Sequence, residues 1–264
     1  MLNIGVCIKP VPAAKDWERI TIDPVTKSLV RQGVEMVMNP TDKHALELAL
    51  TLKEEAGGKV MVFTMAPPLG KEALLEALAM GADEAYLLSD RVFAGADTLA
   101  TVRVLAAAIK KSGPFDLILT GDKSYDGGTG HIAPQLGVML GVPYLNNVID
   151  FQYSEGGAVT LKSKAESGFY LWQGKLPLVL GITNKVNRPR FTTLRGVLAA
   201  KKKPLTVWSN EELGLDPATC GLPGSPTKPG DLFTPEFSRL GETITGDKAT
   251  IAARILKIIR DSVS

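Results

Sequence analysis

The residues best suited to chemistry gather in one glycine-rich segment, residues 121–135, which reads GDKSYDGGTGHIAPQ. Glycines let the backbone approach a ligand closely, and the free N–H groups that open the following helix favour an anion such as phosphate. The glycines are Gly127, Gly128 and Gly130, the hydroxyl donors are Ser124 and Thr129, and the carboxylate is Asp126, which can accept from backbone amides or from a ribose hydroxyl. The segment predicts a nucleotide site; the alternative is a glycine-rich turn without a ligand.

Known phosphate-binding signatures fit this segment poorly. The pattern GxxxxGK[ST] is absent, which disfavours a P-loop kinase or ATPase. Residues 128–133 match GxGxxA, with Asp150 about twenty residues further on, but this match follows the fourth predicted strand, whereas the dinucleotide fingerprint follows the first. The two histidines and two cysteines lack metal-ligand spacing, and no nucleophile–base pair is recognisable. The sequence therefore predicts a nucleotide cradle without catalytic residues.

Two other strand ends and one helix start supply residues that could border the same site. In a parallel sheet, ligands bind outside the carboxyl ends of the strands. The first strand ends at residues 7–10 (CIKP), the second at residues 64–67 (TMAP), and residues 39–42 (NPTD) lead into a helix. Asn39 could read an adenine edge, with Thr41 or Asp42 as the helix cap; the alternative is that Asn39 and Asp42 only shape the turn and cap the helix.

These segments need a framework of strands and helices, which alternate along the first half of the chain. Apolar runs predict strands at residues 2–8, 60–65, 85–88 and 116–120, and helical periodicity predicts helices at 42–55, 71–80, 98–111 and from near 129 to 141. Four later strands, at 148–153, 158–163, 169–172 and 178–183, are separated by little but turns. The sequence predicts an α/β fold, with a mainly parallel, twisted, Rossmann-like sheet, helices on both faces, and an antiparallel or mixed late part.

The composition of the chain changes after Lys203: as far as Pro235 it is rich in proline, glycine and serine and lacks the periodic hydrophobic pattern. An amphipathic helix at residues 248–262 follows. We therefore expect an α/β nucleotide-binding domain at residues 1–203 and an extended arm that ends in a helix at residues 204–264. Such an arm grips a partner subunit, or it folds back onto its own core.

Composition and charge exclude several classes of protein. The net charge of +2 does not suit a chain built to coat nucleic acid or an anionic membrane. No apolar run reaches the ~20 residues needed to cross a bilayer, the N-terminus does not resemble a signal peptide, and the two cysteines indicate no disulfide framework. We expect a cytoplasmic protein. Positive charge is concentrated between Lys185 and Lys203, a stretch with seven basic residues and no acid.

Six segments, in this order and over nearly the whole chain, resemble the β (small) subunit of electron-transfer flavoproteins. They are VCIKPVP, MNPTDKHALELAL, TMAPP, EALAMGADEAYLLSDRVFAGADTLAT, DGGTGHIAP and NRPRFTTLRGVLAAKKK. The resemblance implies a heterodimer with a larger α subunit that holds flavin adenine dinucleotide (FAD). The long C-terminal arm of the β subunit would extend to this α subunit. It also implies a nucleotide in β itself. This is AMP in the simpler carriers, or a second FAD that accepts hydride from NADH in the flavin-bifurcating branch.

The strand ends and the resemblance together place the cofactor contacts of this chain. The expected contacts are Cys7, Lys9, Asn39, Pro40, Thr41, Asp42, Met65, Ala66, Asp97, Thr98, Gly121, Asp122, Ser124, Asp126, Gly127, Gly128, Thr129, Gly130, His131 and Ile132. The runs at residues 39–43 and 89–98 resemble the bifurcating branch. The sequence of the glycine-rich loop differs from QAIDGDTAQVGP, the sequence usual in that branch. It differs still more from the loop sequence of the AMP-binding members. We expect FAD in this subunit, with AMP as the alternative.

The basic stretch contains the counterpart of the family's partner-recognition loop, residues 187–198. The resemblance makes Leu194 the apolar anchor that docks onto acyl-CoA dehydrogenases, with Arg190, Thr193 and Arg195 beside it. An apolar anchor ringed by charge fits a transient protein interface. The alternatives for this stretch are a solvated face or a nucleic-acid patch.

For the whole chain we expect an electron-carrier subunit rather than an enzyme, apart from NADH oxidation within a bifurcating complex. Two alternatives belong to other classes. One is an enzyme that hydrolyses or transfers a nucleotide on a similar α/β fold. The other is a stress-type nucleotide-binding regulator, which would be stable alone as a homodimer.

Overall fold

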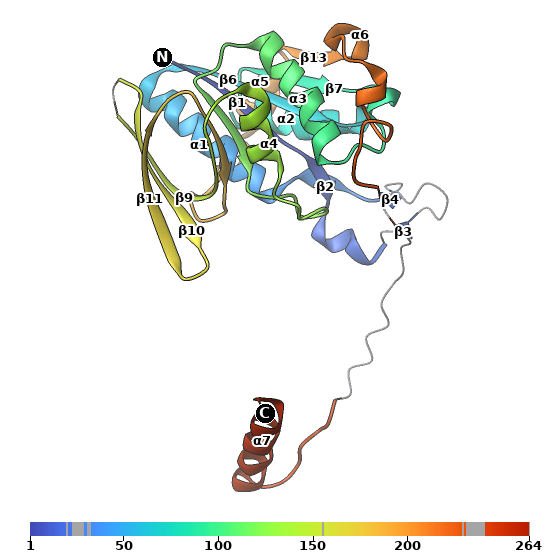
Figure 1. Cartoon of the computed structure of the whole chain (residues 1–264), viewed down its shortest axis with the longest axis vertical. Coiled ribbons are helices and arrows are strands. Elements are labelled where there is room, and N and C mark those ends of the chain that lie inside the picture. Colours follow the sequence, from blue (N-terminus) through green and yellow to red (C-terminus); the bar gives the residue numbers. More distant parts are fainter. Residues whose placement is uncertain are drawn as a thin grey trace. The chain divides into compact units, whose positions relative to one another are not determined.

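A computed structural model describes residues 1–19, 21–22, 29–30, 33–154, 156–228, 230 and 241–263. The chain divides into two compact units, Met1–Pro229 and Gly230–Ser264. The first unit is an α/β domain built on one large sheet (Figure 1). Within the described ranges, no helix has the length and apolar character needed to span a bilayer.

The sheet has nine strands in the order β11-β10-β9-β12-β8-β1-β6-β7-β13. All neighbouring strands from β9 to β13 pair in parallel, and β9, β10 and β11 pair antiparallel. The strands are β1 (Leu2–Cys7), β6 (Gly58–Met65), β7 (Glu84–Leu88), β8 (Leu117–Gly121), β9 (Tyr144–Ser154), β10 (Ala158–Ala165), β11 (Gly168–Lys175), β12 (Leu178–Ile182) and β13 (Leu205–Trp208). The predicted mainly parallel sheet with a mixed late part is confirmed.

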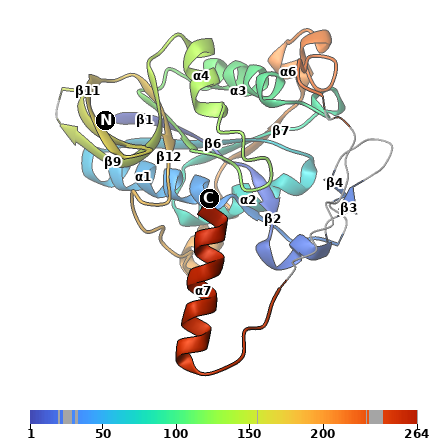
Figure 2. The same ribbon diagram turned by 60° about the horizontal axis from the view of Figure 1, so that its bottom comes forward.

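Helices cover both faces of the sheet (Figure 2). Side chains of α1 and α2 join one buried apolar cluster with Ile4 and Val6 of β1, and those of α3 and α4 join a second cluster with Cys7. This division follows from the strand period of two, which sends successive side chains to opposite faces. The helices are α1 (Pro40–Ala56), α2 (Lys71–Met80), α3 (Thr98–Ser112), α4 (Ile132–Leu140), α5 (Leu194–Ala200) and α6 (Asn210–Leu213).

Shorter strands and helices lie outside the nine-stranded sheet and its covering helices. Two small antiparallel ribbons pair β2 (Pro10–Pro12) with β5 (Met36–Met38), and β3 (Thr21–Ile22) with β4 (Leu29–Val30). Short 3₁₀ helices lie at Ala14–Arg19, Pro68–Gly70, Arg91–Phe93 and Pro217–Thr219. In the second unit, helix α7 (Lys248–Val263) matches the predicted helix, and Asp247 accepts from Thr250 N at its start.

The boundary of the α/β domain differs from the expectation that it ends at residue 203. Strand β13 pairs with β7 and forms the edge of the sheet. Further along, Arg103 of α3 donates to the carbonyls of Thr219 and Gly224, so this part of the supposed arm folds onto the domain. The compact unit therefore extends to Pro229. Proline density suggested an extended chain here, but β13 and these backbone contacts lie between the prolines.

Candidate functional site

The glycine-rich segment forms the loop between β8 and α4, at the carboxyl edge of the sheet. Strands β1, β6, β8 and β12 are parallel neighbours, so their carboxyl ends share this edge. Gly128 and Gly130 have φ values of 65° and 68°, in the left-handed region that favours glycine. A helix was predicted from near Thr129. It begins at Ile132 instead, because the left-handed backbone at Gly130 interrupts any earlier turn.

The last part of this loop presents an uninterrupted run of free backbone N–H groups. Among the described residues, the N–H groups of residues 129–133 have no protein acceptor. His131 is the N-cap residue of α4 but makes no side-chain cap, and Pro134 has no N–H to add. Because the positive end of the helix dipole coincides with this run, the arrangement suits the oxygens of a phosphate or pyrophosphate.

Asn39 fastens the first part of the loop. It is fully buried, and its Nδ2 donates to Lys123 O at 3.0 Å and to Thr41 and Asp42. Its Oδ1 accepts from Tyr125 N at 3.1 Å. Thr41 Oγ1 donates to the same Lys123 carbonyl at 2.8 Å. The amide of Asn39 is thus committed to the loop, and this favours the turn-shaping alternative over direct reading of an adenine edge.

Asp42 joins three parts of the chain through one buried carboxylate. Its Oδ1 accepts from Gly121 N at 2.9 Å and from Asn39 Nδ2, and its Oδ2 accepts from Lys9 N at 2.7 Å. A Cβ on Gly121 would lie 2.4 Å from Asp42 Oδ1, which explains the glycine there. The expectation that Asp42 or Thr41 caps the helix is wrong, since Asn39 is the N-cap residue and α1 has no side-chain cap.

The charge state of Asp42 reflects opposing influences. Burial raises the pKa of Asp42 to about 7, although the N–H donors from Asn39, Lys9 and Gly121 act in the opposite direction. Burial also raises the pKa of the Cys7 thiol, with the Asp42 carboxylate adding to the effect. Cys7 therefore lies at the end of β1 as a neutral, buried thiol rather than as a nucleophile.

An ion pair bridges the end of β1 and the tip of the loop. Lys9 Nζ lies 2.7 Å from Asp126 Oδ1, and only 7% of the Asp126 side chain is exposed. Although burial opposes it, the Lys9 charge helps to lower the pKa of Asp126. Ser124 Oγ accepts from Gly127 N at 3.3 Å inside the same turn. Of the two roles expected for Asp126, this geometry favours loop support over a ribose contact.

Buried oxygens without a partner border the loop. Within the described part of the chain, Asp122 Oδ1, Gln135 Oε1 and Asn146 Oδ1 accept no hydrogen bond. Asn146, on β9, donates from Nδ2 to Gly130 O at 3.1 Å and so supports the loop. Burial raises the pKa of Asp122. Such orphaned acceptors fit the hydroxyl or amino donors of a nucleotide.

Not every expected contact residue joins this group. Met65 and Ala66 are half-buried at the carboxyl end of β6. Asp97 is instead the N-cap of α3, where it accepts from Ala100 N and from Thr227 N. In the described residues, no hydrogen bond or ion pair ties Asp97 or Thr98 to the loop. Asn146 was missed by the sequence analysis, where its only signal was a polar pair in an otherwise strand-like run.

A hollow of 430 Å³ at the opposite edge of the sheet lacks this chemistry, because apolar groups such as Ile109, Phe115 and Leu178 line most of it. No cluster of His, Cys, Asp and Glu in the described ranges could hold a metal ion. The loop between β8 and α4 is therefore the best candidate for a ligand site.

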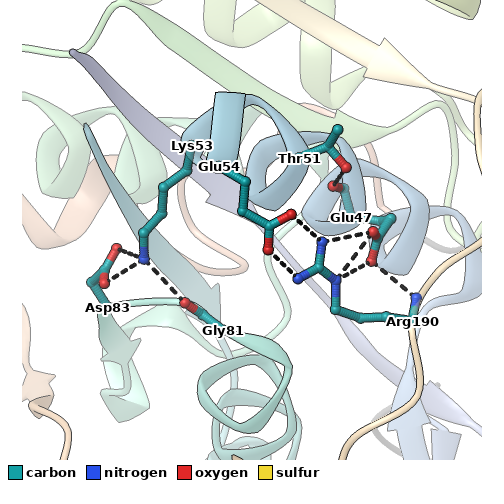
Figure 3. Close-up of polar contacts among 7 residues, drawn as sticks. All are labelled: Glu47, Thr51, Lys53, Glu54, Gly81, Asp83 and Arg190. Atoms are coloured by element: carbon teal, nitrogen blue, oxygen red, sulfur yellow. Dashed lines mark hydrogen bonds and ion pairs between the residues drawn. The ribbon is translucent and has the colours of Figure 1, made fainter. Parts of the chain in front are cut away.

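The second candidate surface is the segment at residues 187–198, which we call the docking segment. Phe191 and Leu194 are 94% and 79% exposed, and Leu198 is also exposed. Thr193, which was expected among the partner contacts, is the N-cap of α5 and accepts from Gly196 N at 3.0 Å. Arg195 is exposed, whereas Arg190 is paired inside the chain with Glu47 and Glu54 (Figure 3).

Comparisons with known proteins find a matching family and relatives that cover most of the chain. The model of the electron transfer flavoprotein domain matches residues 26–213. The caffeyl-CoA reductase-Etf complex subunit CarD of Acetobacterium woodii is 42% identical over 93% of this chain and 92% of its own. An electron transfer flavoprotein subunit beta of Thermoanaerobacterium thermosaccharolyticum is 42% identical over 93% of each chain. Protein FixA of Azorhizobium caulinodans is 38% identical over 89% of this chain and 85% of its own.

Proposed function

Because the chain belongs to the electron-transfer flavoprotein family, as its β subunit, we propose that it binds an FAD of its own in the β8–α4 loop. With an α subunit it carries electrons between dehydrogenases and an acceptor. The observation that carries the proposal is the run of free N–H groups at residues 129–133, beside the three orphaned oxygens.

The residues present fit such a cofactor. The N–H groups of residues 129–133 would bind the pyrophosphate, and Asn39, Asp42 and the Lys9–Asp126 pair would hold the loop open for it. Asp122 and Asn146 would accept from its hydroxyl or amino groups. When bound, the flavin supplies the one- and two-electron chemistry, while the protein fixes its position and its surroundings.

AMP is the second candidate for this site, because the loop geometry accommodates one phosphate as well as two. FAD is favoured by the runs at residues 39–43 and 89–98, and by the 42% identity to a subunit of a caffeyl-CoA reductase-Etf complex. In that case NADH is a candidate donor to the complex. Asp97 and Thr98 would then act near the flavin only through the start of α3, where Asp97 is the cap.

The partner of the docking segment is, on this proposal, a flavin enzyme of the acyl-CoA dehydrogenase type. Two exposed apolar side chains, Phe191 and Leu194, would enter a pocket, and the exposed Arg188 and Arg195 would speed the encounter with an acidic rim. We place the complex in the cytoplasm, with no nucleic acid among its partners.

Reconstitution tests the carrier function. The αβ complex should pass electrons from a short-chain acyl-CoA dehydrogenase, reduced with butyryl-CoA, to a dye acceptor. The β subunit alone should be inactive and poorly soluble, and neither preparation should hydrolyse ATP. A stable β homodimer that binds nucleotide without α, or turnover of ATP, would support one of the other two classes instead.

A further inference from the structure

The docking segment is fixed to helix α1 by one arginine. Arg190 N and Nε both donate to Glu47 Oε2 at 2.9 Å, and Nη2 donates to Glu47 Oε1 at 3.0 Å. Nη1 and Nη2 also donate to Glu54, at 2.5 and 3.1 Å. Figure 3 shows the guanidinium held between the two carboxylates of α1. All three guanidinium nitrogens are therefore engaged inside the chain.

The contacts of Arg190 with Glu47 and Glu54, which we call the clamp, match the geometry of the helix. Glu47 and Glu54 are seven residues apart, which is about two helical turns, so both carboxylates lie on one face of α1. His44, on an adjacent turn, interacts through Nδ1 with Asn187 Oδ1 at 2.9 Å, and its carbonyl accepts from Asn187 Nδ2 at 3.0 Å. Residues 187–190 are thereby laid along α1 at two points.

Burial separates this clamp from an ordinary surface ion pair. The Glu47 side chain is 10% exposed and that of Arg190 is 32% exposed, so water screens their contact only in part. A bidentate arginine–carboxylate pair also fixes orientation, which a lysine contact does not. The hydrogen bonds to Glu54 and Glu47 raise the pKa of Arg190, and those from Arg190 lower the pKa of Glu54.

The exposed docking side chains follow the clamp directly. Phe191 is the next residue, and Leu194 begins α5, whose Gly196 packs so closely on α2 that a Cβ would lie 2.4 Å from Ala79 O. Phe191 and Leu194, which form the apolar tip of the docking segment, therefore lie between two residues held in place by contacts within the chain, Arg190 and Gly196. A tip ordered before binding loses less conformational entropy when it docks.

We propose that Arg190 is a positioning residue: through Glu47 and Glu54 it preorganises Phe191 and Leu194 for an apolar pocket on the partner dehydrogenase, and it does not contact that partner itself. This inference rests on the proposed docking role of residues 187–198. It replaces the expectation that Arg190 is one of the partner contacts.

The test is a double-mutant cycle in the full αβ complex. The variants are Arg190→Ala, Glu47→Ala and the two combined. The readout is reduction of the complex by a short-chain acyl-CoA dehydrogenase with butyryl-CoA. Each single change should raise the apparent KM for the carrier about five- to tenfold and leave kcat at saturation unchanged. The effects of the two changes should be less than additive in the double variant, because each removes the same bidentate contact between the Arg190 guanidinium and Glu47.

A partner-free readout accompanies the kinetics. Hydrogen–deuterium exchange of residues 191–200 in the free complex should speed up in Arg190→Ala. The matched control is Arg188→Ala, an exposed arginine two residues away, which should weaken the salt dependence of the reaction without changing the exchange.

The outcomes distinguish failure of this inference from failure of the proposed docking role of residues 187–198. Additive effects of Arg190→Ala and Glu47→Ala, with unchanged exchange, would mean that Arg190 contacts the partner directly. Faster exchange with an unchanged KM would also overturn the inference. Leu194→Ala in the same assay reports on the docking segment itself: if its KM is unchanged, the docking role fails, whatever the cycle shows.

Discussion

Asp42→Ala is expected to empty the nucleotide site of the β subunit and to destabilise it by about 3 kcal/mol or more. The change leaves two donors, Lys9 N and Gly121 N, without their acceptor, whereas Asn39 Nδ2 keeps its hydrogen bonds to Lys123 O and Thr41 Oγ1. An orphaned buried donor costs roughly 1–3 kcal/mol, and a cavity adds to that. The loop would then lose the backbone conformation that presents residues 129–133.

The measurement has two parts, made on the purified αβ complex. Nucleotide released on denaturation is quantified by chromatography, and thermal unfolding is followed with and without added FAD. The control is Glu76→Ala on α2, which removes a half-buried ion pair to Lys43, the neighbour of Asp42 on α1, and should leave the nucleotide content unchanged. If Asp42→Ala retains wild-type nucleotide, the loop is not held as we describe.

Leu194→Ala is expected to raise the KM of the carrier for its dehydrogenase on the order of tenfold, which corresponds to about 1.4 kcal/mol of binding free energy. The side chain is 79% exposed, so truncation leaves no cavity and should not change the unfolding temperature. The effect should therefore fall on docking alone. It is measured by varying the carrier concentration in the assay with reduced acyl-CoA dehydrogenase.

Leu171→Ala is the matched control for this prediction. Leu171 is a leucine of similar exposure, 69%, on the edge strand β11 outside the docking segment. Its truncation should leave the KM for the dehydrogenase unchanged. An unchanged KM in Leu194→Ala, or an equal rise in both variants, would contradict the assignment of residues 187–198 as the docking segment.

Local signals were sufficient to predict much of this molecule. The strand and helix periods predicted the parallel sheet, because each apolar run has a length that suits one element. The glycines of residues 127–130 predicted the loop, since left-handed backbone strongly favours glycine. The strand that follows Pro204 was missed because four residues are too few for a clear period.

Long-range polar contacts could not be predicted in the same way. Arg190 and Glu47 are 143 residues apart, and Asn146 of β9 donates to Gly130 in the loop. Neither pairing leaves a periodic trace in the sequence. Asp97 was expected to contact the flavin because of the sequence run in which it lies, whereas in the structure it caps α3. An aspartate directly before a helix suits either role, so the sequence alone did not distinguish them.

The central claim is that the β subunit holds its own FAD, and a nucleotide count tests it most directly. The wild-type αβ complex is denatured, and the released nucleotides are separated and quantified per heterodimer. We predict two FAD and no AMP. One FAD and one AMP per heterodimer would contradict the claim and make the complex a carrier with a single flavin.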